Sequence, residues 1–504
     1  MSSWLSSIAS IPVRKKLARV SNVPMAKTGS SSGTCIETIT LPGRTAGVPT
    51  PGTLFAALVV AFSSTALAAQ EPPRGSNVPG AELVPLPVLG GDRVTSGSAF
   101  NPGISIIVDM VQYHQSGSIE DPAGFEGGHD HGYGHGDDHG LEEGFNLRET
   151  ELTFTATVDP YFDALATLAF DEHGVEVEEA YATTRNLPAG LRVKVGKFLS
   201  DVGYINAQHP HDWAFVDRPL VNEFLFGDHG LQETGVQLTW MPATPFYSQF
   251  GIELLQGESD GISPYVGAGR VEHVTVLPDA DGNPVRVRWR DDNPFSDESG
   301  PRLITGFAKF GPDLGYDHAA QFGLSYGYAR AFQRDDLHSS LRYESWEGSA
   351  WFAGLDAVYK YDAGRNYGHG DWVVQGEYFY REIDANFREM RFQNGNLEIT
   401  HAESATARQD GLYLQALYGV APRWQAGLRA EALGLTNRNA LVEDDFFADF
   451  GTSYRYAGSV TFRPTEFSMF RAQLNRSDYY DQDPEWAFML QFQMALGVHG
   501  AHKF

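Results

Sequence analysis

Apolar and polar positions alternate along the last stretch of the chain, residues 486–504. From 488 to 498 the even positions are apolar and the odd positions are mostly polar or small: Phe488, Leu490, Phe492, Met494, Leu496 and Val498 against Met489, Gln491, Gln493, Ala495, Gly497 and His499. A period of two predicts an extended strand with one apolar side. A transmembrane barrel ends in this way, because its last strand must pair with its first. A terminal strand of a soluble sandwich is the alternative.

The same alternation recurs upstream, for example at Val236, Leu238 and Trp240 against Glu233, Gln237 and Thr239. In a barrel the polar partners would face the lumen and line a water-filled pore. The charged candidates for this lining carry both signs: Lys194, Glu233, Glu253, Asp356, Glu377, Arg381, Arg429 and Arg471. A lining of mixed sign indicates weak selectivity or a preference for cations.

Two kinds of connection separate the alternating runs. Seven are short and mostly contain proline, which belongs at turns because it cannot donate to a sheet. Eight lie on the other side, and apart from a tight one at 172–174 they are mostly long, polar and acidic: 114–145, 200–230, 257–301, 333–348, 384–410, 436–452 and 478–485. Fifteen connections join about sixteen strands. Short turns on one side and long loops on the other are typical of outer-membrane barrels.

Composition fits this reading. Aromatic residues make up 12% of the 504 residues, and after residue 70 no apolar run reaches the roughly twenty residues that a membrane helix needs. We therefore expect an all-β fold, a transmembrane antiparallel β-barrel of about sixteen strands with short periplasmic turns and long extracellular loops. The net charge of −27 disfavours nucleic acid as a partner and favours cations.

The N-terminal region has the features of an export signal. Residues 54–62 form a short apolar core, Ala66-Leu67-Ala68 follows as a small-x-small cleavage motif, and basic residues lie upstream. We expect residues 1–68 to be a cleaved signal peptide with a long leader, 69–102 a flexible periplasmic lead-in, and 103–504 the barrel. A retained membrane anchor is the alternative for the first segment. Cleavage would remove Cys35, the only cysteine, and the expected location is the outer membrane of a Gram-negative cell.

The first long loop is rich in histidine and aspartate. Its candidate metal ligands are His129, Asp130, His131, His135, Asp137, Asp138 and His139. Imidazole and carboxylate on a glycine-rich chain can wrap a zinc, copper or nickel ion. No cofactor is required by the sequence, and Zn²⁺ at this loop is the candidate ligand. A solvated loop without a specific role is the alternative.

The loop at 201–230 is unusually apolar for its length. Residues such as Trp213, Phe215 and Leu225 would form an exposed apolar patch in water, so we expect the loop to fold into the barrel and narrow the pore. It also carries His209, His211 and Asp212. His209 and His211 share one side of an extended chain and could hold a metal or a polar substrate. Structural histidines bonded to loop carbonyls are the simpler alternative, because a metal needs further ligands.

No catalytic residues are predicted. The chain contains no nucleophile elbow, phosphate-binding loop or zinc-protease helix motif, and we expect no enzyme activity. An outer-membrane enzyme stays an alternative, since barrel loops can hold catalytic triads.

Four motifs carry a resemblance that spans about the whole mature chain. They lie at 98–102, 196–198, 203–213 and 497–504, and the third, Gly203-Tyr204-Ile205-Asn206-Ala207-Gln208-His209-Pro210-His211-Asp212-Trp213, is the most specific. The chain resembles a proteobacterial family of porin-like outer-membrane barrels, similar to phosphate-selective porins and often labelled zinc-regulated or TonB-dependent outer membrane receptors. The resemblance implies a sixteen-strand type of barrel and a link to zinc.

The sequence thus favours a porin-like outer-membrane channel for diffusion of small solutes or ions, with the His/Asp-rich outer loop relating it to divalent metal. An energy-coupled, TonB-dependent type of metal receptor is the alternative within transport. The expected partners are outer-membrane lipid and small solutes or ions, without nucleic acid. A homotrimer is considered because porins are commonly trimers, although no segment indicates an interface.

Overall fold

The computed structural model describes one part of the chain. The described residues are 97–98, 101–117, 121–125, 141–171, 174–227, 229–278, 284–337, 342–393, 396–439 and 448–497. The chain divides into units 1–84 and 85–504, and every described residue belongs to the second unit. The predicted signal peptide, most of the lead-in, and the His/Asp loop at 128–140 therefore lie outside the described residues.

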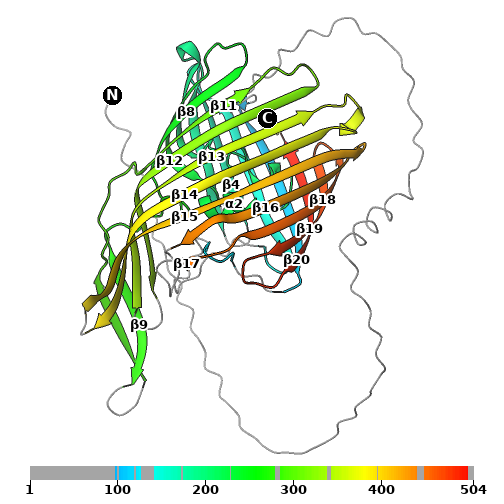
Figure 1. Ribbon diagram of the computed structural model, residues 1–504. Coiled ribbons are helices and arrows are strands. Elements are labelled where there is room, and N and C mark those ends of the chain that lie inside the picture. Colours follow the sequence, from blue (N-terminus) through cyan, green and yellow to red (C-terminus); the bar gives the residue numbers. More distant parts are fainter. Residues whose placement is uncertain are drawn as a thin grey trace, which may run out of the picture. The chain divides into compact units, whose positions relative to one another are not determined.

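The second unit is a closed antiparallel β-barrel of sixteen principal strands (Figure 1). Each strand pairs with its neighbours in chain order: β2 Asn101–Gln115, β3 Gly144–Thr157, β4 Phe162–Phe170, β5 Val175–Thr184, β6 Leu191–Leu199, β7 Gln232–Trp240, β8 Tyr247–Leu255, β11 Leu303–Gly311, β12 His318–Leu337, β13 Arg342–Tyr361, β14 Trp372–Gln393, β15 Asn396–Ala421, β16 Trp424–Asn439, β18 Ser453–Thr465, β19 Ser468–Asp478 and β20 Glu485–Gly497. The two-residue strands β1 (Gly97–Ser98) and β17 (Ala448–Asp449) extend this sheet.

The last strand closes the barrel against the first, as the alternating C-terminal pattern predicts. Strand β20 pairs with β19 on one side and with β2 on the other, where Met110 lies opposite Phe492. Along β20, Leu490 is 45% exposed on the outside whereas Gln491 is 2% exposed. Closure gives the backbone N–H and C=O groups of the first and last strands their hydrogen-bond partners, which is the condition for strands to cross a lipid bilayer.

The barrel wall is uneven in height. Strands β4, β6, β7 and β8 have nine residues each, whereas β12 to β15 have 20, 20, 22 and 26. The expectation of loops at 333–348 and 384–410 is therefore wrong, because strand structure covers most of both ranges. These polar residues stay in register through cross-strand ion pairs such as Arg408–Glu382. The polar residues of these ranges lie mainly on the outer face, whereas buried side chains such as Phe387 and Phe392 alternate with them on the inner face.

A separate hairpin lies beside the tall strands. Strands β9 (Arg270–Pro278) and β10 (Pro284–Asp292) pair only with each other, within the connection between β8 and β11. Val271 and Trp289 of this hairpin pack with Tyr343, Met390 and Phe392 of β13 and β14. Figure 1 shows β9 beside the far ends of the tall strands.

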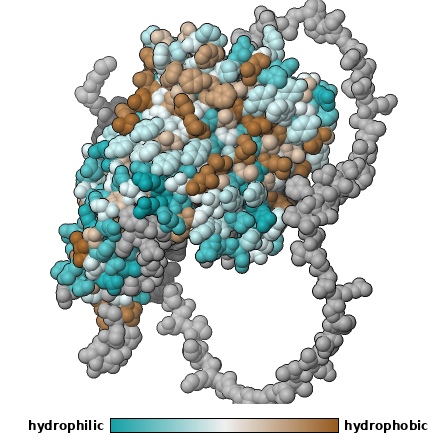
Figure 2. All heavy atoms as spheres, in the orientation of Figure 1, coloured by the Kyte–Doolittle hydropathy of each residue, from teal (hydrophilic) through white to brown (hydrophobic). Residues whose placement is uncertain are grey.

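The outer face of the barrel is apolar. Large exposed apolar side chains recur on strands all around the wall, among them Ile104, Val195, Val236, Leu238, Ile252, Leu254, Leu324, Leu355, Leu414, Leu428, Tyr456, Phe470 and Leu490. Figure 2 shows hydrophobic residues across the barrel wall in this view and mostly polar residues near the β9 hairpin. A patch of this extent is far larger than a protein surface in water ordinarily exposes.

The helices are few and short. Among the described residues there are the three-residue 3₁₀ turns η1 (Pro188–Gly190), η2 (Pro210–Asp212) and η3 (Asn366–Gly368), and one α-helix, α2 (Leu220–Phe226). No helix within the described ranges is long and apolar enough to cross a membrane.

Candidate functional site: a segment packed inside the barrel

Residues 200–231, here called the inserted segment, connect β6 to β7 and carry η2 and α2. The ends of the two strands are adjacent, with Leu199 opposite Gln232 in register. A tight turn could join them, yet the chain makes a long excursion into the barrel. Most of the segment is buried, including Val202, Val216 and Leu225 at 0% exposure. The prediction that this apolar loop packs inside the barrel is confirmed by this burial.

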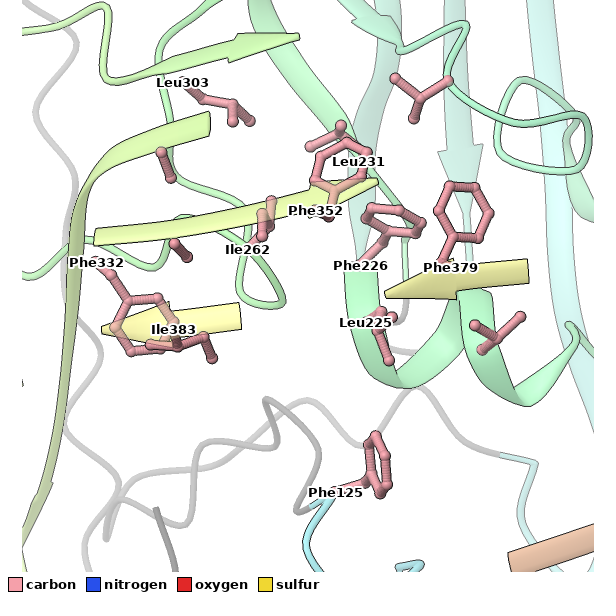
Figure 3. Packing of buried hydrophobic residues seen from close by; sticks show 14 of the residues in the cluster. Phe125, Leu225, Phe226, Leu231, Ile262, Leu303, Phe332, Phe352, Phe379 and Ile383 are labelled. Atoms are coloured by element: carbon pink, nitrogen blue, oxygen red, sulfur yellow. The ribbon is translucent and has the colours of Figure 1, made fainter. Parts of the chain in front are cut away.

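Helix α2 of the segment forms an apolar core with the inner wall. Phe226 of α2 lies edge-on to Phe352 and Phe379, with ring centroids 5.0 Å apart in both pairs. Figure 3 shows Phe226 beside these two rings, with Leu225 and Ile262 nearby. Burial of large aromatic and aliphatic side chains is the main force that holds the segment in place.

Buried polar groups of the wall bind the backbone of the segment. Glu377 accepts hydrogen bonds from the backbone N–H groups of Tyr204 and Ile205 and from Asn222 Nδ2 at 2.9 Å. Arg381 donates to the Leu225 carbonyl at 3.1 Å. Glu253 accepts from Ser200 Oγ at 2.5 Å. The segment is therefore fixed in one position by hydrogen bonds to charged partners, which are about twice as strong as neutral ones.

Residues 209–211 of the segment place two histidines against acidic wall residues. We call this the histidine end: His209 and His211 of the segment with Glu149 and Glu151 of β3 and Glu178 and Glu179 of β5. His209 Nε2–H donates to Glu179 Oε2 at 3.0 Å, and His211 Nδ1 lies 2.6 Å from Glu151 Oε1. Burial alone would lower the pKa of His209, but Glu151 and Glu178 outweigh it and raise the pKa well above its usual range. The two rings stack 5.6 Å apart.

Two β-bulges give this end its high charge density. In β3 the register shifts between Asp109 and Met110, so Arg148 is left without a partner residue on β2. A second register shift, opposite Thr167 and Leu168 of β4, leaves Glu178 of β5 without a partner residue on β4. A bulge turns an extra side chain toward one face of a sheet. Glu178 and Glu179 thus both reach His209, and Arg148 reaches Asp109 and the Val216 carbonyl.

A second charged cluster of the segment has the opposite arrangement, with wall arginines around a segment carboxylate. We call it the aspartate end: Asp217 of the segment with Arg429, Glu431 and Arg455 of the wall. Arg429 Nη2 donates to Asp217 Oδ1 at 2.6 Å, and Arg455 Nη1 lies 3.2 Å from Asp217 Oδ2. Glu431 accepts from both arginines and from the Leu220 N–H. Burial alone would raise the pKa of Asp217, but Arg429 and Arg455 hold it well below its usual range.

All eight predicted pore-lining residues lie inside the barrel, where neighbouring parts of the chain cover their side chains. Their exposed fractions are 6% or less: Lys194, Glu233, Glu253, Asp356, Glu377, Arg381, Arg429 and Arg471. The inserted segment bonds most of them, for example Arg471 through the Trp213 carbonyl at 2.9 Å. Glu233 instead accepts from the backbone of the β8–β11 connection, at Glu258 and Ser259. Their role in lining a pore stays a prediction.

A cavity of about 390 Å³ lies on the short-turn side of the inserted segment. The segment contributes Tyr204, His211 and Asp212 to its lining, and the β18–β19 turn contributes Glu466 and Phe467. His211 and Asp212 therefore connect the histidine end with space inside the barrel.

The structure describes three of the ten predicted metal ligands. His209 and His211 meet at the histidine end, with Asp212 Oδ1 3.6 Å from His211 Nε2. The seven residues His129, Asp130, His131, His135, Asp137, Asp138 and His139 lie outside the described residues, so their metal role stays a prediction. Sequence reasoning missed the acidic partners on β3 and β5. The run Glu176, Glu178 and Glu179 was a usable signal, because it breaks the strict alternation of the strand.

Comparisons with known proteins give one relative in sequence. No protein-family model matches the chain. A protein of Aquifex aeolicus (strain VF5), described as an uncharacterized protein, is 35% identical over 434 residues, which cover 82% of this chain and 83% of that protein.

Solved structures with a similar fold are outer-membrane proteins of low sequence identity. The channel DcaP of Acinetobacter baumannii is 11% identical, with 81% of this chain and all of that chain covered and a TM-score of 0.45. OmpT of Vibrio cholerae is 10% identical, with 80% of this chain and all of that chain covered and a TM-score of 0.44. An anion-selective porin from Comamonas acidovorans is 11% identical over 79% of this chain and 99% of that chain, with a TM-score of 0.42.

Proposed function

The chain belongs to one family with the Aquifex aeolicus protein, and we propose that it is an outer-membrane channel for small solutes or ions, narrowed by its inserted segment. The observation that carries the proposal is the apolar outer wall of a closed barrel. Leu238, Ile252 and Leu428 are 41%, 50% and 57% exposed on three different strands. Only lipid would cover such a belt around the whole barrel.

The inner face supports a polar path of small cross-section. Charged and amide side chains cover it, and the inserted segment fills part of the space that they enclose. A lumen narrowed in this way suits small hydrated solutes or ions better than large substrates. The residues inside carry both signs, which favours weak selectivity over a strong preference for anions.

Single-channel recording tests the proposal. The mature protein, refolded and inserted into a planar bilayer under a salt gradient, is expected to give small stepwise currents with a reversal potential near zero or of cationic sign. A correctly folded barrel that gives no current steps would contradict the channel proposal. A reversal potential of strong anionic sign would contradict the proposed selectivity.

We further propose that the His/Asp loop at 128–140 gathers divalent cations at the mouth of the channel. Its four histidines and the net charge of −27 support this role, since an acidic rim raises the local concentration of cations. Micromolar Zn²⁺ is then expected to change the current of the wild type. Replacing His129, His131, His135 and His139 together with serine should reduce the change in current that Zn²⁺ causes. An unchanged response of the current to Zn²⁺ would contradict this role.

A further inference from the structure

Three ligand atoms converge at the histidine end. One carboxylate oxygen each of Glu151 and Glu178 and one ring nitrogen of His209 lie within 4.8 Å of one another. His209 Nδ1 is 3.3 Å from Glu178 Oε2 and 3.7 Å from Glu151 Oε1. Three atoms on three separate elements, β3, β5 and the inserted segment, can therefore reach one ion between them.

The orientation of the His209 ring suits a ligand. Its Nε2–H donates to Glu179 Oε2 at 3.0 Å, which directs Nδ1 toward Glu151 and Glu178. Metal-binding histidines have this arrangement almost always, with the second ring nitrogen bonded to a carboxylate or carbonyl. Glu151 is supported in a similar way, because its Oε1 lies 2.6 Å from His211 Nδ1.

Two buried carboxylate oxygens at this end, Glu149 Oε1 and Glu178 Oε2, accept no hydrogen bond of good geometry. Glu178 Oε2 has the His209 ring 3.3 Å away, at Nδ1. Glu149 is only 8% exposed, and its carboxyl group lies against that of Glu178. An unpaired buried carboxylate oxygen is costly, and a cation between such oxygens removes the cost.

The charge balance points the same way. Glu151, Glu178, Glu179 and Asp212 bring four carboxylates within 4.0 Å of two imidazoles. The guanidinium of Arg148, on the same strand as Glu151, is paired with Asp109. Even with both histidines protonated, two negative charges would remain without compensation in a buried place.

We propose that Glu151, Glu178 and His209 bind one divalent transition-metal ion of the zinc type, which joins the inserted segment to the barrel wall. A mixed set of one imidazole and two carboxylates suits Zn²⁺ and its neighbours, whereas Mg²⁺ and Ca²⁺ prefer oxygen ligands alone. Glu179 and His211 position the ligands, and the Glu149 carboxyl group lies beside them. The cavity lined by His211 and Asp212 borders this end.

This inference goes beyond the proposed channel activity, because an ion can bind here whether or not the barrel conducts. It also differs from metal binding at the His/Asp loop, which lies elsewhere in the sequence. The experiment must therefore separate the two sites and leave conduction out of the readout.

Metal binding to the refolded, EDTA-treated mature protein tests the proposal. In the background variant, His129, His131, His135 and His139 are replaced by serine, so that the outer loop contributes no imidazole. Zn²⁺ is titrated calorimetrically, and Co²⁺ is used in parallel because its absorption spectrum reports ligand type and geometry. The variants Glu178→Gln and His209→Gln are added to this background. Glu176→Gln is the matched control, since Glu176 lies on the same strand and its side chain is 44% exposed.

The background variant is expected to bind one Zn²⁺ and to give a Co²⁺ spectrum of a nitrogen and oxygen site. Glu178→Gln and His209→Gln should each weaken binding by at least about tenfold, as loss of groups at a metal centre commonly does. Glu176→Gln should leave the affinity unchanged, and excess Mg²⁺ should not compete. No binding in the folded background variant, or equal affinity of Glu178→Gln and Glu176→Gln, would overturn the proposal. If His209→Gln fails to fold, the near-isosteric Glu178→Gln decides alone.

Discussion

Two charged clusters of the inserted segment, the histidine end and the aspartate end, have opposite electrostatic arrangements. At the aspartate end, one segment carboxylate and one wall carboxylate form close ion pairs with two arginines, so these buried charges cancel, and the more exposed Glu223 lies 3.9 Å from Arg455. At the histidine end, three wall carboxylates and Asp212 of the segment meet two imidazoles, so negative charge is in excess. Arginine stays charged at any ordinary pH, whereas an imidazole can exchange its proton for a metal.

The difference assigns separate roles to the two ends. A balanced, fully bonded cluster fixes the segment permanently, because breaking it would leave a buried charge unpaired. How firmly an unbalanced cluster holds the segment depends instead on whether it binds a cation. We therefore regard the aspartate end as the fixed attachment of the segment and the histidine end as the attachment that responds to its surroundings.

The largest effect is expected from breaking the aspartate end. Arg429→Met removes bonds to Asp217 and Glu431 and leaves excess negative charge buried, which should lower the free energy of unfolding by about 3–5 kcal/mol. Denaturant unfolding in lipid vesicles measures this change. Arg438→Met, at an exposed position of the same strand β16, is the control and should change stability little. Equal effects of the two variants would refute the special role of Arg429.

Metal should stabilise only the histidine end. With Zn²⁺ at about 100 times its dissociation constant, the free energy of unfolding should rise by about 2.7 kcal/mol over the value in EDTA. The background variant without the four outer-loop histidines should keep this gain, and His209→Gln should lose it. A gain that survives in His209→Gln would place the ion elsewhere.

Removing a carboxylate should have opposite signs at the two ends. In metal-free protein, Glu149→Gln relieves repulsion from Glu151 and Glu178, so we expect it to raise the free energy of unfolding by about 1 kcal/mol or more. Asp217→Asn should lower it, because Arg429 and Arg455 lose their partner. Denaturation of both variants in EDTA measures the contrast. Destabilisation by Glu149→Gln would show that the histidine end is balanced after all.

Acid should weaken the aspartate end gradually. The pKa of Asp217 is lower in the folded protein than in the unfolded chain, so its contribution is present above the usual aspartate pKa of about 3.9 and is lost as the pH falls toward the folded value. The loss is at most about 1.4 kcal/mol per pH unit. Unfolding free energies from pH 6 to 2.5 should therefore fall more steeply for the wild type than for Asp217→Asn. Parallel curves would contradict the pKa shift.

Much of the barrel could be predicted from the sequence because its signals are local. Alternation along each strand, proline in the turns and the apolar C-terminal pattern each depend on neighbouring residues. The burial of the segment at 201–230 followed from its apolar residues alone. The tall hairpins of β12 to β15 could not be predicted, because the inner face of their outer halves packs against the β9–β10 hairpin, which lies far away in the sequence.

The partners of the inserted segment could not be predicted in the same way. His211 and Glu151 are 60 positions apart, and Asp217 and Arg429 are 212 apart, so only the closed barrel brings them together. Two bulges also place Arg148 and Glu178 on the face opposite to the one that strict alternation gives. A register shift of one residue is therefore enough to make the sequence pattern assign a side chain to the wrong face of the sheet.

Shortening the inserted segment tests the central claim most directly. Because Ser200 N–H donates to the Leu231 carbonyl at 2.9 Å, a short glycine-serine turn can replace 201–230 without disturbing β6 and β7. As a matched control, the β9–β10 hairpin is shortened between Gly269 and Asn293, which are also hydrogen-bonded at 3.0 Å. Single-channel conductance should rise clearly when the segment is shortened and stay at the wild-type value when the hairpin is shortened. Equal conductance of all three proteins would contradict the claim that the segment narrows a channel.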